Sequence, residues 1–325
     1  MHPAFSVIFL TTLIGVGQGL FLALYTGQIY ALAKLLPAQS GEFQSLGSFI
    51  ALGFLLAGLT ASFFHLGHPE RAWRSMSQWR TSWLSREVIV LPLFMVLVFL
   101  YGIVHGMGWT HPLFTLAEAL PVDMTLIIGL LGTLAAFGLF LCTAMIYASL
   151  RFLQEWHTPL TVANYTFLGI ASGFMLAAAL SAWQGAHLVG FYGFWAVVAT
   201  VLGMGTRIAS LVRNGRLGHK STLQTAIGVR HTQMAQKAQG FMGGSFNTRE
   251  FFHGRSEGAL KAIRAGFILL VFVVPTLLIG LAWAIQSSYL PAAAFGVQYI
   301  GLLLERYHFF ADARHPQNLY YQSVA

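Results

Sequence analysis

The feature that most constrains this chain is a series of long apolar runs separated by polar connections. A helix needs about 20 mainly apolar residues to cross roughly 30 Å of hydrocarbon. Because lipid offers no hydrogen-bond partners to the backbone, such a run must form a helix there. The sequence therefore predicts an all-α integral membrane protein, a single domain over residues 1–325 built as a bundle of about eight transmembrane helices. The predicted spans lie near residues 5–30, 44–64, 87–108, 123–150, 161–182, 188–206, 265–286 and 291–307.

The eighth predicted span departs most from this pattern, because it contains Gln298 and ends at Glu305 and Arg306. Composition supports the membrane class as a whole. Charged residues make up 9% of the chain, whereas soluble domains carry about 25%. The net charge of +8 does not indicate nucleic acid, since the basic residues lie between apolar runs rather than on a soluble fold.

The distribution of basic residues predicts the orientation. Seventeen of the 18 lysines and arginines fall in connections on one side of the predicted spans, and only Lys34 falls on the other. The basic side of a membrane protein faces the cytoplasm. We therefore expect both termini in the cytoplasm. The longest connection, a basic loop at about 207–264, is either a solvated segment near anionic lipid or a docking surface for a cytoplasmic partner.

Glycines recur at helical spacing in two of the predicted spans. Gly15 and Gly19 lie in a glycine-rich stretch of the first span, which lacks the strand–turn–helix setting of a nucleotide-binding loop. Gly102 and Gly106 lie in the third span. We expect both pairs to allow close packing of neighbouring helices.

The chain offers few groups that could hold a redox centre. Its one cysteine, Cys142, cannot form an internal disulfide, and an iron–sulfur cluster typically needs about four thiolates. Any cluster must then belong to a partner. His105 and His187 lie at one predicted depth and could ligate a b-type haem, but we interpret them as interfacial histidines and expect no haem or metal site.

Polar side chains gather near one membrane face in the segment 65–87. His65 ends the second predicted span, and Ser85, Arg86 and Glu87 open the third. Two neighbouring helix ends thus bring a histidine, a carboxylate and arginines to one level of the interface. Three tryptophans in the segment fit an interfacial aromatic belt: Trp73, Trp79 and Trp83.

Such a corner suits a quinone. The tail of a quinone lies in lipid, its ring needs apolar walls, and its two oxygens need hydrogen bonds. Reduction takes two protons, which a histidine or carboxylate near one oxygen can supply. The alternative is that the arginines are ordinary cytoplasmic-side charges and that Glu87 merely favours its helix start through the helix dipole.

Four motifs resemble the membrane-anchor subunit of dimethyl sulfoxide reductase-type molybdenum enzymes, the DmsC-like family. They are His65–Trp73, Ser82–Glu87, Arg306–Phe310 and His315–Tyr321. The resemblance extends over the whole chain. The opening segment Met1–Phe9 is further similar to the anchors of cytoplasmic sulfite dehydrogenase, the SoeC-like branch.

The resemblance implies a complex in which the cofactors are divided among subunits. A catalytic subunit carries molybdenum bis-pyranopterin, a ferredoxin-like subunit carries 4Fe–4S clusters, and the anchor binds ubiquinone or menaquinone. The family's quinone-site residues correspond to His65, Gly67, Arg71 and Glu87. To these our interpretation of the segment adds Trp73, Ser85 and Arg86.

The predicted function is transfer of electrons from the iron–sulfur subunit to quinone during oxidation of sulfite to sulfate. His65 would bond one quinone oxygen and relay a proton, and Glu87 would supply protons or fix His65. Arg71 would stabilise negative charge or hold the partner. The resemblance implies the inner membrane of a bacterial cell. Since these motifs share the basic side, we expect the partner subunits on its cytoplasmic face.

Three other functions remain open at this stage. The first is a menaquinol-oxidising anchor of a reductase for dimethyl sulfoxide or another oxo acceptor, for which a Tat signal on the catalytic subunit would argue. The second is a stand-alone transporter, which predicts discontinuous helices and buried ion ligands. The third is a haem-bearing anchor, which a reduced-minus-oxidised spectrum would reveal.

Overall fold

The computed structural model describes residues 1–116, 120–218, 221–235, 237, 252–316 and 318, and long helices dominate them. The long helices are α1 (Phe5–Leu32), α2 (Gly41–Phe63), α3 (Trp83–Gly106), α4 (Met124–Ala148), α5 (Pro159–Gln184), α6 (Val189–Gly215), α9 (Glu257–Ile268), α10 (Val274–Ile285) and α11 (Leu290–Ala311). The π-helical segment η3 (Leu269–Val273) joins α9 to α10 without a break. Short elements connect the rest: η1 (Pro69–Gln78), the hairpin of β1 (Phe114–Leu116) and β2 (Leu120–Val122), η2 (Ala186–Leu188) and α7 (Leu223–Ile227).

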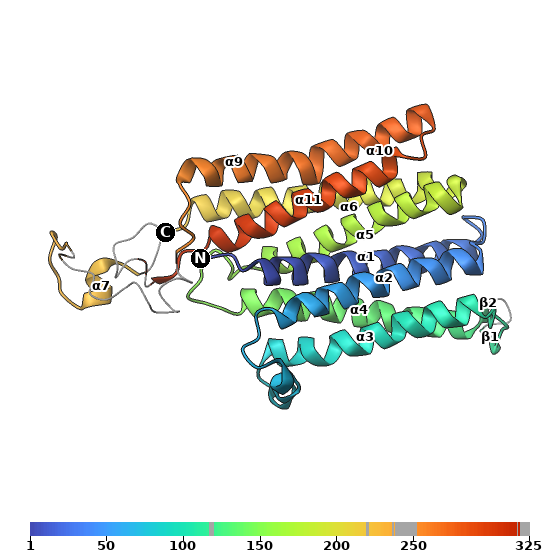
Figure 1. The fold of residues 1–325 in the computed structure, drawn as a ribbon, viewed down its shortest axis with the longest axis horizontal. Helices are drawn as coiled ribbons and strands as arrows, with labels where there is room; N and C mark the ends of the chain where they lie inside the picture. Colours follow the sequence, from blue (N-terminus) through green and yellow to red (C-terminus); the bar gives the residue numbers. More distant parts are fainter. Residues whose placement is uncertain (117–119, 219–220, 236, 238–251, 317, 319–325) are drawn as a thin grey trace.

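The helices run side by side, and their connections alternate between two ends of the bundle (Figure 1). One end holds the N-terminus, η1, the α4–α5 connection, α7 and the end of α11. We call it the basic end, because the connections rich in arginine and lysine lie there. The other end holds the β1–β2 hairpin, η2 and the α10–α11 turn. The alternation agrees with the order of connections predicted from charge.

Seven helices of the described part of the chain are long and apolar enough to cross a membrane. They include the continuous run Glu257–Ile285. The expectation of an all-α membrane bundle is therefore confirmed. The eighth predicted span corresponds to α11, which is 22 residues long but carries four buried polar or charged side chains: Gln298, Glu305, Arg306 and His308.

The sixth span extends further than the sequence indicates. Hydropathy predicts its end at residue 206, with Arg207 opening a basic loop, but α6 continues to Gly215. Arg207 is buried inside the helix bundle and only 2% exposed. The loop predicted at 207–264 is thus reduced to the segment between Gly215 and Glu257, part of which lies outside the described residues.

Helix α1 lies near the centre of the bundle and makes its closest contact with α5. Gly15 and Gly19 of α1 face Gly169 and Gly173 of α5, and a methyl group built at Gly173 would overlap the backbone of Gly19. In the third span, a methyl group at Gly102 would lie 3.1 Å from Cβ of Ser48, and one at Gly106 would lie 2.8 Å from Oγ of Ser45. Both predicted glycine pairs therefore permit close helix packing.

We expect Gly173→Ala to prevent normal packing of α1 on α5. The added methyl group meets backbone atoms, which cannot rotate away, so the cost should reach at least the roughly 1–3 kcal/mol typical of overpacking. Gly190→Ala in α6 is the matched control, because nothing lies within 4 Å of its Cβ position. Two measurements would report the effect: the amount of protein inserted in the membrane, and the midpoint of its unfolding in mild detergent. Equal midpoints for the two variants would contradict this account of the α1–α5 contact.

Gln298 has a structural role that explains its place in an apolar helix. Pro275 has no N–H, so it cannot donate to the carbonyl of Val271, four residues earlier. The side-chain amide of Gln298 donates to that carbonyl at 3.2 Å and to Thr200 Oγ1 at 3.2 Å. These two bonds tie α11 to η3 and α6, and the bond to Val271 gives its backbone carbonyl a donor that lipid could not supply.

Candidate functional site

The first half of the predicted site is an exposed segment that follows α2. His65, Gly67 and Arg71 are all exposed there. The side chain of His65 has no hydrogen-bond or ion-pair partner among the described residues. Desolvation lowers the pKa of His65 below its ordinary value of 6.5, so the ring is neutral at pH 7. A neutral imidazole can both donate and accept a hydrogen bond, which is what exchange of a proton with a bound ring requires.

Charged groups of η1 bond mainly to one another. Oε1 of Glu70 lies 3.1 Å from Nδ1 of His68 and 3.5 Å from Nε of Arg71. All three side chains are more than half exposed, so these ion pairs contribute little to stability. Arg71 therefore carries its charge at the surface, where either a partner protein or a ligand can reach it.

Three arginines lie over tryptophan rings along the same segment. Arg74 lies 5.6 Å from the ring centre of Trp73, and Arg86 lies 4.2 Å from that of Trp83. Arg86 also donates to the carbonyls of Trp79 and Arg80 at 2.9 and 2.8 Å. These bonds fix the end of η1 against the start of α3. Trp73 remains 63% exposed, as an aromatic side chain at a membrane interface can be.

The second half of the predicted site is the first turn of α3. Ser82 caps the helix by accepting from the N–H of Ser85 at 3.3 Å. This start places Ser85 and Glu87 inward, where they are 2% and 7% exposed. The carboxylate of Glu87 accepts a short hydrogen bond from the hydroxyl of Thr143 on α4. The structure thus places a buried carboxyl group within one turn of the surface segment.

The predicted residues therefore divide into two groups. Ser85, Arg86 and Glu87 lie together at the start of α3, and Arg86 links them to η1. His65, Gly67, Arg71 and Trp73 lie on the connecting segment, and within the described residues neither His65 nor Gly67 bonds to the first group. Thr143 was not predicted, because nothing in the sequence pairs it with a carboxylate 56 residues earlier.

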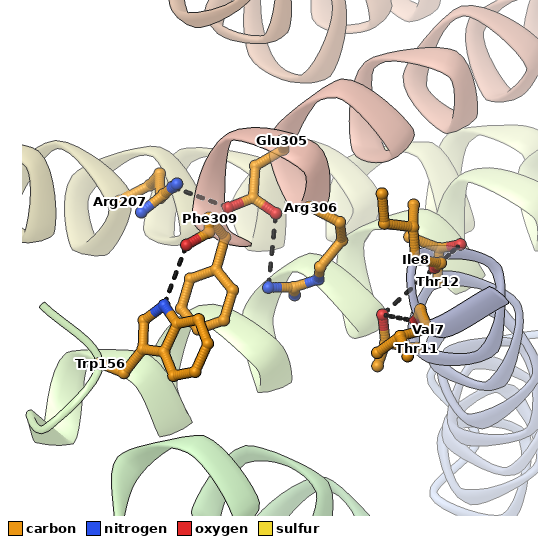
Figure 2. Close-up of polar contacts among 9 residues, drawn as sticks. All are labelled: Val7, Ile8, Thr11, Thr12, Trp156, Arg207, Glu305, Arg306 and Phe309. Atoms are coloured by element: carbon orange, nitrogen blue, oxygen red, sulfur yellow. Dashed lines mark hydrogen bonds and ion pairs between the residues drawn. The ribbon is translucent and has the colours of Figure 1, made fainter. Parts of the chain in front are cut away.

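Sequence reasoning also missed a buried cluster of charges at the same end (Figure 2). Figure 2 shows Arg207 of α6 and Arg306 of α11 directed at the carboxylate of Glu305. Arg207 Nε lies 2.7 Å from one oxygen, and Arg306 Nη1 lies 3.4 Å from the other. All three side chains are at most 4% exposed. The only hint of this cluster in the sequence was that Glu305 and Arg306 follow one another at the end of an apolar run. That pattern by itself indicates the end of a membrane span.

Aromatic rings enclose this charge cluster. Arg306 lies 3.6 Å from the ring centre of Tyr165, and Arg207 lies 5.3 Å from that of Phe267. The indole N–H of Trp156 donates to the carbonyl of Phe309 at 2.9 Å and ties the α4–α5 connection to α11 (Figure 2). The Arg306–Phe310 motif is therefore a packing motif of the basic end, and part of the His315–Tyr321 motif lies outside the described residues.

The two histidines weighed as haem ligands differ in their surroundings. His105 is 7% exposed and its ring centre lies 4.5 Å from that of Tyr101. His187 lies in η2 and is exposed. Neither belongs to a group of three or more histidine, cysteine or acidic side chains, since the described residues contain no such group placed to hold a metal ion.

Comparison with known proteins identifies the family. The family described as DMSO reductase anchor subunit (DmsC) matches residues 1–303. The chain belongs to the DmsC family. It is also similar to a sulfite dehydrogenase subunit of Allochromatium vinosum, with 66% identity over 325 residues and full coverage of both chains. The resemblance inferred from the motifs is thereby confirmed, and this DmsC-family protein is an anchor subunit of an oxidoreductase complex rather than a stand-alone transporter.

Proposed function

We propose that this DmsC-family protein is the quinone-reactive anchor of a sulfite:quinone oxidoreductase complex. A molybdopterin subunit and a ferredoxin-like 4Fe–4S subunit would dock at the basic end, on the cytoplasmic face of the bacterial inner membrane. Electrons would pass from the last cluster to ubiquinone or menaquinone. The identity to a protein named as part of a sulfite dehydrogenase supports sulfite as the electron donor.

One observation carries the proposal: Glu87 is a buried carboxyl group at the level where the chain leaves the membrane. Burying a carboxylate without a cation is costly, and Thr143 supplies only a neutral hydroxyl. A carboxyl group in this setting favours its protonated form. A group that holds a proton at the same end of the bundle as the exposed imidazole of His65 would suit quinone chemistry.

The residues at this corner fit a quinone. When bound, a quinone accepts two electrons and two protons. His65 would hold one ring oxygen through a hydrogen bond, and Glu87 would hold a proton close to it. Arg71 would contribute positive charge, while Trp73 would form an apolar wall. Ser85 and Arg86 keep Glu87 in place by fixing the start of α3.

We expect His65→Ala to lower sulfite-dependent quinone reduction by the intact complex about 100-fold, the lower range for losing a general acid or base. Transfer of electrons from sulfite to ferricyanide should stay unchanged, because that reaction needs only the partner subunits. His187→Ala is the matched control, since His187 is an exposed histidine at the opposite end. Quinone reduction at the wild-type rate in His65→Ala would argue against the site.

A further inference from the structure

An open groove on the outer surface of α5 lies apart from the proposed quinone site. Its volume is about 730 Å³, within the roughly 300–1,000 Å³ of typical small-molecule sites. One wall of the groove is a face of α5. Its residues are spaced three or four apart and so form one stripe along the helix: Pro159, Val162, Ala163, Thr166 and Phe167. This stripe extends about 12 Å from the start of α5 toward the centre of the bundle.

The second wall comes from the last turn of α4. Met145 and Ala148 line it. Met145 follows Thr143 by two residues and therefore lies on a different side of α4 from the partner of Glu87. The groove is thus an apolar channel that is separate from the buried carboxyl group.

The end of the groove at the basic end is polar, and an arginine is bonded to the backbone there. His157 lines it, and its Nδ1 lies 2.6 Å from the carbonyl of Ala148. Because a carbonyl only accepts, the hydrogen is on Nδ1, and this bond fixes the imidazole ring at the end of the groove. Arg213 donates to the carbonyl of His157 at 3.3 Å and to that of Gln154 at 3.0 Å. A permanent cation is thus bonded to the backbone of a residue that lines the groove, near the positive N-terminal end of α5.

We propose that this groove binds an anionic phospholipid. One acyl chain would lie along the α5 stripe, and the phosphate would lie at the mouth near the guanidinium of Arg213 and the start of α5. A negatively charged head group complements the positive charge of Arg213. A quinone ring is neutral, and the positive group of a zwitterionic lipid offsets its own phosphate, so neither matches this charge as well. Basic pockets between helices on the cytoplasmic side commonly take anionic head groups. The inference does not depend on which reaction the complex performs.

The test measures lipid binding to the purified, delipidated complex in mild detergent. Native mass spectrometry would compare phosphatidylglycerol with phosphatidylcholine of the same acyl chains, and ubiquinone would serve as competitor. We expect the wild-type complex to bind phosphatidylglycerol about tenfold more tightly. Equal binding of the two lipids, or displacement of phosphatidylglycerol by ubiquinone, would overturn the proposal without any variant.

Variants then locate the site. Ala163→Trp fills the groove and should remove the preferred lipid, whereas Ala265→Trp adds the same bulk to an exposed position on α9 at the same end and should not. Arg213→Gln should abolish the preference for the anionic lipid, and Arg213→Lys should restore it by restoring the charge. Unchanged binding in Ala163→Trp would overturn the placement, as would failure of Arg213→Lys to differ from Arg213→Gln.

Discussion

Glu305→Gln is expected to lower the free energy of unfolding by about 3–5 kcal/mol, the cost of breaking a buried ion pair from one side. Glu305 is 0% exposed and is the carboxylate that both Arg207 and Arg306 contact. Glutamine preserves the shape but removes the charge. Two guanidinium groups would then remain buried at the basic end with no anion between them.

Counting charges predicts an order among variants of this cluster. Arg207→Met removes the closer cation but leaves Glu305 and Arg306 as a neutral pair. It should therefore destabilise the protein less than Glu305→Gln does. Unfolding midpoints in mild detergent would measure both. Glu257→Gln is the control, because Glu257 is 83% exposed and 3.9 Å from Lys261, and exposed pairs contribute little.

The opposite order would contradict this interpretation. If Arg207→Met destabilised the protein more than Glu305→Gln, the packing of Arg207 against Phe267 would matter more than charge balance. A fall in stability for Glu257→Gln equal to that for Glu305→Gln would mean that the assay reports something other than burial.

The charge cluster also shows why the sequence predicted α6 incompletely. A single arginine in an apolar helix is costly in lipid, so a rule that considers one segment at a time ends the span before Arg207. Glu305 lies 98 residues further along the chain, and only packing of α11 on α6 brings it to Arg207. The positions of the spans follow from local hydropathy, whereas such a pairing depends on which helices are neighbours.

The candidate site divides in the same way. The grouping of Ser85, Arg86 and Glu87 was predictable, because residues within one turn of a helix start share a level of the membrane. The burial of Glu87 against Thr143 was not, since it depends on the contact between α3 and α4. The hydrogen bonds by which Arg86 connects the end of η1 to α3 were also not predicted. Arg86 donates them to backbone carbonyls, which no pattern of side chains reveals.

We expect Glu87→Gln to lower sulfite-dependent quinone reduction about 1,000-fold, within the range for loss of a general acid or base. The effect should exceed that of His65→Ala for a physical reason. His65 is exposed, so water can partly replace its proton transfer, whereas Glu87 is 7% exposed and water cannot take its place. Glutamine keeps an oxygen to accept from Thr143, so the fold should persist while the exchangeable proton is lost.

The measurement compares quinone reduction with ferricyanide reduction in the intact complex, and only the first should fall. Glu42→Gln is the matched control, because Glu42 is an exposed glutamate at the opposite end of the bundle, in the first turn of α2. Glu87→Asp should recover part of the rate, since it restores an acidic group at a shorter reach. If Glu87→Asp and Glu87→Gln were equally slow while both complexes stayed assembled, the side chain would act by shape, and proton supply at this corner would have to come from another group.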